Sequence, residues 1–149
     1  MTEILFYHLT ESRLEDALPA LLEKSLARGW KVVVETAGEP ARDALDAHLW
    51  VYRDDSFLPH GTDQAPHGER QPIFLTAGAD NPNGADVRFL TGGVPVGDVQ
   101  AYQRVVLMFD GHDEDQLQGA RKQWKALKEQ DHALTYWQQG SDGRWERKA

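Results

Sequence analysis

The first fifty residues alternate between short apolar runs and segments with helical spacing, and this alternation limits the possible folds most strongly. Residues 3–9 (EILFYHL) and 30–35 (WKVVVE) are short and apolar, as buried strands are. Between them a helical pattern ends at Gly29, with leucines at positions 14, 18, 21, 22 and 26. A second helical pattern over residues 38–50 places Pro40 in its first turn. This order predicts an α/β sheet with right-handed crossovers.

The remainder of the chain extends the same pattern. Apolar runs at residues 72–77 (PIFLTA), 85–92 (ADVRFLTG) and 104–111 (RVVLMFDG) predict three more strands. Residues 113–130 form the clearest helix, because an acidic first turn and basic later turns match the helix dipole. The tail from residue 133 predicts two short strands around a Ser-Asp-Gly turn.

These elements predict a single domain over residues 1–149, a length that can bury a core by itself. We expect an α/β fold with a mixed, mostly parallel central sheet flanked by helices, in a Rossmann-like three-layer arrangement. Pro19 is tolerated only near a helix start, so the first helix should begin around Asp16 or Ala17. After Gly61 the polar sequence predicts a loop. The second helix should turn one face to the core, formed by Ala41, Ala44, Leu45, His48 and Leu49.

Composition excludes several classes of protein. The absence of cysteine rules out disulfides and thiolate chemistry and fits a reducing compartment. No signal-peptide pattern opens the chain, and no apolar stretch reaches about 18 residues, so we expect a cytoplasmic protein. The net charge of −8 is uneven, because residues 119–149 carry seven basic and four acidic side chains. Such a protein repels nucleic acid overall and can still attract a small acidic partner at its basic end.

Motifs for catalysis are weak. Residues 92–97 (GGVPVG) lack the lysine of a phosphate loop, and residues 109–115 (FDGHDED) lack the ligand spacing of a calcium loop. We therefore expect no catalytic residue, no cofactor and no metal. One alternative stays open, a small α/β nucleotide-handling or metal-dependent hydrolase with His60, His67 and Asp55 in its site.

Two stretches favour protein binding. On the C-terminal helix, Leu117, Ala120, Trp124 and Leu127 recur at core spacing, and Arg121, Lys125 and Lys128 recur on an adjacent face. A tryptophan bordered by cations suits a peptide that carries carboxylates and a terminal aromatic residue, although a core tryptophan beside a solvated face would look the same.

The second stretch is HLWVYRDDSFLPHG, residues 48–61, which places Trp50, Phe57, Leu58 and Pro59 close together. Burying all of them in a short segment is difficult, so the alternative to core packing is an exposed partner site. A weaker possibility is direct binding of single-stranded DNA by the basic tail, with Trp137 and Trp145 stacking on bases.

The chain resembles the chi subunit of bacterial DNA polymerase III, a clamp-loader accessory protein. The resemblance covers nearly the whole length and rests on the order and spacing of FYHL, ARGWKVVV, LDAHLW, SFLPHG, QPIFLT, RVVLMFDG and ARKQWKALKEQDHALTYWQQ. It implies an α/β fold without catalytic activity. It also implies a protein that bridges the clamp loader to single-stranded-DNA-binding protein, whose acidic C-terminal tail ends in proline and phenylalanine.

Residues of this chain match both of the family's binding surfaces. Arg121, Trp124 and Lys125 match the motif that docks the acidic tail, and Lys128 joins them by helical position. The resemblance assigns the segment around Trp50, Phe57 and Pro59 to the surface that holds the psi subunit, and its histidines are incidental to that surface. The second partner could be psi, another clamp-loader protein or a helicase-like protein.

Overall fold

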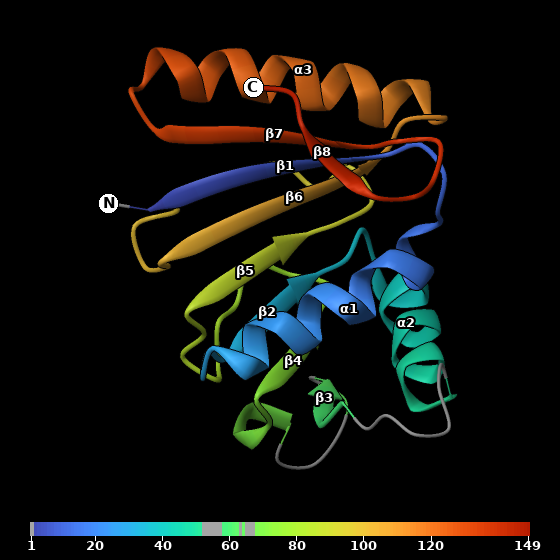
Figure 1. The fold of residues 1–149 in the computed structure, drawn as a ribbon. Helices are drawn as coiled ribbons and strands as arrows, with labels where there is room; N and C mark the ends of the chain where they lie inside the picture. The colour runs from blue at the N-terminus through green and yellow to red at the C-terminus, as the bar shows by residue number, and fades with distance from the viewer. Residues whose placement is uncertain (1, 52–57, 63, 65–67) are drawn as a thin grey trace.

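The computed structural model describes residues 2–51, 58–62, 64 and 68–149 as a three-layer α/β domain (Figure 1). The elements in chain order are β1 (Glu3–Leu9), α1 (Leu14–Ala27), β2 (Val32–Glu35), α2 (Glu39–Val51), β3 (His60–Thr62), the short 3₁₀ helix η1 (Gly68–Arg70), β4 (Ile73–Thr76), β5 (Val87–Leu90), β6 (Arg104–Asp110), α3 (Glu114–Glu129), β7 (Ala133–Gln139) and β8 (Trp145–Arg147).

The sheet has the strand order β3-β4-β2-β5-β6-β1-β7-β8. Every neighbouring pair in this order is parallel except β7 and β8, which run antiparallel. β1 lies between β6 and β7, with Phe6 opposite Leu107 on one side and Tyr136 on the other. The predicted fold class, a mostly parallel mixed sheet flanked by helices, is confirmed.

Alternate side chains of each strand enter two separate cores, because successive side chains of a strand point to opposite faces. Leu5 and Leu9 of β1 pack with the leucines of α1 and α2. Ile4 and Phe6 of the same strand pack with α3 and with the segment that follows β5. α1 and α2 therefore cover one face of the sheet, and α3 covers the other.

The ends of two helices follow from local chemistry. The helix α1 ends at Ala27, and Gly29 follows its cap with a φ of +79°, a left-handed conformation that glycine adopts without strain. Asp113 precedes α3, and its carboxylate accepts hydrogen bonds from the backbone N–H groups of Asp115 and Gln116 at 3.0 and 3.2 Å. This N-cap confirms that the acidic segment before α3 starts the helix.

The predicted start of the first helix is wrong. The helix α1 begins at Leu14, so Pro19 lies inside it and is buried. A proline inside a helix costs about 3 kcal/mol, whereas each large apolar side chain contributes about 1.5–3 kcal/mol when fully buried. Leu18 and Leu22 are completely buried on the same helix, and their burial offsets the cost of the lost hydrogen bond.

Two further expectations around α2 need correction. The chain after Gly61 is not entirely loop, because β3 extends to Thr62 and pairs parallel to β4, and η1 follows at Gly68–Arg70. Backbone hydrogen bonds hold this polar strand, so it carries no apolar pattern. On α2 the buried residues are Arg42, Leu45 and Leu49. The predicted core face is wrong in part: Ala41 and Ala44 are exposed and His48 is half-buried, since alanine is too short to fill the gap between α1 and α2.

Candidate protein-binding site

The helix α3 presents two distinct faces, as its sequence predicts. Ala120 and Leu127 are buried against β6 and β7, and Leu117 and Trp124 are half-buried beside them. Arg121, Lys125 and Lys128 are exposed on the adjacent face. None of these three cations forms an ion pair with a carboxylate of the residues that the structure describes. We call the three residues the cationic face.

Trp124 links the cationic face to an aromatic cluster on the sheet. Its ring meets the rings of Phe6 and Tyr136 edge-to-face, with centroid separations of 5.3 and 5.6 Å. Tyr136 in turn stacks on Phe6 at 6.5 Å. These contacts fix the orientation of the indole, because edge-to-face pairs are the preferred geometry of aromatic rings. A half-buried, oriented aromatic surface therefore lies directly beside the cationic face.

His8 extends this cluster at the carboxyl end of β1. Its ring stacks on Phe109 at 4.8 Å, and its Nδ1 lies 2.8 Å from the hydroxyl of Tyr136. Burial lowers the pKa of His8, and Arg121 and His112 lower it further by charge repulsion. A neutral imidazole can accept a hydrogen bond from the Tyr136 hydroxyl. Burial raises the pKa of Tyr136, and Arg121 opposes that shift, so Arg121 lies close to both groups.

Sequence reasoning did not identify His8, Tyr136 or Phe109 as part of this site. The alternation of β1 carries a weak signal, because His8 lies two residues after Phe6 and therefore on the same face of the sheet. Gly111 is also part of the arrangement, since a Cβ at this position would collide with the His8 ring. The close approach of β6 to His8 explains why glycine occupies this position.

The second predicted surface lies at the opposite end of the sheet. Trp50 and Val51, at the end of α2, are 55% and 75% exposed. Pro59 is half-buried, and Leu58 is buried in the core. Phe57 lies outside the described residues. In Figure 1, α2 and β3 lie far from α3, and β3 and β8 are the two edges of the sheet, so the structure separates Trp50 from the cationic face.

His60, one of the two histidines of the hydrolase alternative, is buried and packs from β3 against α2. His60 in β3 is 5% exposed, its Nδ1 lies 2.6 Å from the carbonyl oxygen of Leu58, and its ring packs on Trp50 at 4.5 Å. Its Nε2 lies 3.0 Å from Asp46 Oδ1, although the angle is poor for a hydrogen bond. His60 thus joins α2 to β3.

The other residues of that alternative, His67 and Asp55, lie outside the described residues. Over residues 2–51, 58–62, 64 and 68–149, no group of three histidine, aspartate or glutamate side chains is placed to hold a metal ion. Within the same ranges, no helix combines the length and apolar character needed to cross a membrane.

The fold and these surfaces define a three-layer α/β domain with a cationic helix face beside an aromatic cluster. A family model described as "DNA polymerase III chi subunit, HolC" matches residues 1–135, and the chain therefore belongs to the family of DNA polymerase III chi subunits.

Two relatives agree with this assignment. The "Probable DNA polymerase III subunit chi" of Rickettsia prowazekii is 26% identical over 117 residues, covering 74% of this chain and 71% of the relative. The "DNA polymerase III subunit chi" of Pseudomonas aeruginosa is 32% identical over 91 residues, covering 58% of this chain and 62% of the relative. The chain is thus an accessory subunit of DNA polymerase III by family.

Proposed function

We propose that this chain is a non-enzymatic adaptor that links the clamp-loader part of DNA polymerase III to the acidic C-terminal tail of single-stranded-DNA-binding protein. The observation that carries the proposal is the half-buried Trp124, held edge-to-face by Phe6 and Tyr136 and bordered by the cationic face. Aromatic anchors in partly desolvated sites dominate many protein interfaces, and carboxylates bind to lysine and arginine by charge-assisted hydrogen bonds.

The position of Arg121 suggests the direction of the bound tail. Its charge influences both His8 and Tyr136, so it lies at the aromatic end of the cationic face. We assign the terminal carboxylate of the tail to Arg121 and its terminal aromatic ring to the surface of Trp124.

Acidic residues further back in the tail then meet Lys125 and Lys128. Lys128 lies seven positions after Arg121 on the helix, which corresponds to a rise of about 10 Å. An extended peptide covers that distance in about three residues. A tail ending in Asp-Ile-Pro-Phe carries a carboxylate three residues before its last residue, and its length therefore suits the spacing of the two cations.

The exposed Trp50 supports a second binding surface for another subunit. Trp50 is 55% exposed at the end of α2, and the adjacent Val51 is 75% exposed. Exposed apolar side chains that lie close together often mark a protein-docking site. We propose that Trp50, Phe57 and Pro59 contact psi or another clamp-loader or helicase-like protein.

The first experiment is a titration of the full chain against a fluorescent acidic peptide ending in Asp-Ile-Pro-Phe, read by anisotropy at low and moderate salt. The charge reversal Lys125→Glu is expected to weaken binding about 5- to 30-fold, because it removes one exposed ion pair and adds one repulsion. Raising the salt concentration should weaken the wild type as well.

A matched control is Lys24→Glu, an exposed lysine on α1 at the opposite face of the sheet. It makes the same change in net charge and should leave the affinity for the peptide unchanged apart from a small general effect. Equal binding of wild type and Lys125→Glu would refute the assignment of the cationic face to the tail.

A further inference from the structure

A second aromatic surface lies on the opposite face of the sheet from Trp124. Alternation along β1, β7 and β8 brings Tyr7, Trp137 and Trp145 to the side of the sheet that α1 covers. Tyr7 lies 4.7 Å from Trp145 and 6.3 Å from Trp137 between ring centroids. α1 packs chiefly on β2 and β6, so these three half-buried rings lie beyond the edge of the helix. We call them the aromatic platform.

Basic side chains surround the aromatic platform. Arg147 pairs with Trp137 across β7 and β8 and is exposed on the same face. A cavity of about 220 Å³ opens between the platform and α1, and its polar rim includes Lys24, Arg28 and Arg104. Among the described residues that line this cavity, none is acidic. Its volume is below the roughly 300–1,000 Å³ of a small-molecule site, so it has room for a single ring rather than a whole cofactor.

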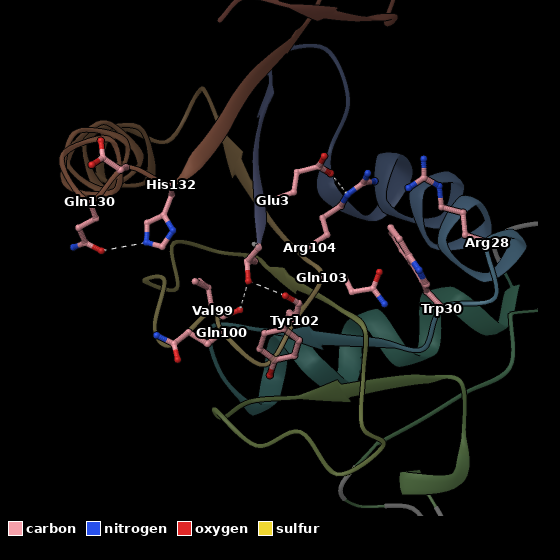
Figure 2. Close-up of a pocket in the computed structure, with 12 residues that line it drawn as sticks. Glu3, Arg28, Trp30, Val99, Gln100, Tyr102, Gln103, Arg104, Gln130 and His132 are labelled. Carbon is pink, nitrogen blue, oxygen red and sulfur yellow. Dashed lines mark hydrogen bonds and ion pairs between the residues drawn. The ribbon is translucent and has the colours of Figure 1, made fainter.

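A larger cavity of about 830 Å³ continues from the first, because Arg28 and Arg104 line both. Figure 2 shows Trp30 standing between these two arginines. Their guanidinium carbons lie 4.8 and 5.0 Å from the centre of the indole ring. Glu3 pairs with Arg104 at 2.5 Å and offsets part of its charge. Arg28 is exposed and keeps its charge available to a ligand.

Flat rings that alternate with cations along one path match the chemistry of single-stranded nucleic acid. Unpaired bases stack on aromatic side chains, and phosphates bind to the basic side chains that follow them. A duplex does not fit, because its bases are not free to stack on the platform. An acidic peptide with a single terminal aromatic residue would use the cations and one of the three rings, and it would leave the other rings of Tyr7, Trp137 and Trp145 without a flat partner.

We propose that the aromatic platform and the adjoining Arg28, Trp30 and Arg104 form a binding surface for single-stranded nucleic acid. The chain as a whole is acidic, so its affinity depends on this local arrangement of cations. The surface lies on the opposite face of the sheet from the cationic face, and the inference does not depend on tail binding.

The test is an anisotropy titration of the full chain against a fluorescent oligothymidylate of about 20 nucleotides, long enough for one binding site. With about three phosphates neutralised, the logarithm of the affinity should fall with a slope of about −2 against the logarithm of salt, or nearly 20-fold between roughly 50 and 200 mM. The same oligonucleotide in duplex form should bind more weakly. No anisotropy change at the lower salt concentration would overturn the proposal.

Two variants locate the site. Arg28→Glu is exposed and should weaken binding about tenfold, and Trp137→Ala should weaken it at least about fivefold through lost stacking. Arg28→Glu keeps the test decisive if Trp137→Ala fails to fold.

Lys122→Glu, at an exposed position of α3 on the other face of the sheet, is the matched control and should bind the oligonucleotide like the wild type, apart from the small general effect of the change in net charge. Loss with Lys125→Glu but not with Arg28→Glu would assign the binding to the cationic face and overturn the proposal. A third outcome is that the protein binds an acidic peptide tightly, that Arg28→Glu abolishes this binding, and that no oligonucleotide binds. This outcome would identify a protein partner for the surface instead of nucleic acid.

Discussion

Truncation of Trp124 tests both the aromatic cluster and the binding site. Trp124→Ala removes two edge-to-face contacts, with Phe6 and Tyr136, which contribute about 1–3 kcal/mol together. A fully buried tryptophan costs about 3–5 kcal/mol when truncated to alanine. Because Trp124 is half-buried, we expect its truncation to lower the free energy of unfolding by about 2–3 kcal/mol.

This loss is large enough to measure and too small to unfold the domain at 20 °C. A domain of this size shifts its melting temperature by about 2–4 °C per kcal/mol, so Trp124→Ala should melt about 5–10 °C below the wild type in calorimetry. The domain should stay folded at 20 °C, where the peptide titration is expected to show a loss of at least tenfold, as for an aromatic anchor.

Trp124→Tyr is the matched variant, since it keeps an aromatic edge between Phe6 and Tyr136. It should recover most of the stability and most of the peptide affinity that Trp124→Ala loses. Lys125→Ala, an exposed neighbour, should change the stability by less than about 0.5 kcal/mol. A melting temperature of Trp124→Ala within about 2 °C of the wild type would refute the claim that the contacts of Trp124 with Phe6 and Tyr136 stabilise the domain. Wild-type affinity in a destabilised Trp124→Ala would instead refute the assignment of the tail's aromatic residue to this site.

Two further predictions concern His8 and the surface around Trp50. The folded-state pKa of His8 lies below its ordinary value of 6.5, so the unfolded chain binds the proton first as the pH falls. His8 therefore contributes stability above pH 6.5 that is lost as the pH falls through 6.5 toward the folded-state pKa. In urea denaturation between about pH 8 and 5, the free energy of unfolding of His8→Gln should decline less steeply with falling pH than that of the wild type. An equal decline in both proteins would contradict this prediction. Phe57→Ala and Trp50→Ala should weaken association with a clamp-loader partner about tenfold or more in surface plasmon resonance and leave peptide binding intact. Loss of partner binding and peptide binding together in a folded variant would mean that the protein has one site rather than two.

Much of the fold could be predicted from local patterns. The apolar runs at β1, β2 and β6 and the two faces of α3 are properties of a few neighbouring residues, and burial and periodicity express them directly. The start of α1 and the strand β3 could not be predicted in this way. Burial of Leu18 and Leu22 offsets the cost of Pro19, and β3 is held by its neighbour β4 through backbone hydrogen bonds.

The sequence by itself determined the cationic face, because Arg121, Lys125 and Lys128 follow the period of one helix. It also determined that Trp50 lies near the end of a helix. Only the tertiary structure decided which aromatic residues stand beside those cations. Phe6 and Tyr136 are far apart in the chain, and they meet at Trp124 because β1 is inserted between β6 and β7. The same strand order joins Tyr7 to Trp137 and Trp145 on the other face. Strand order depends on contacts between distant segments, and no local pattern of residues encodes it.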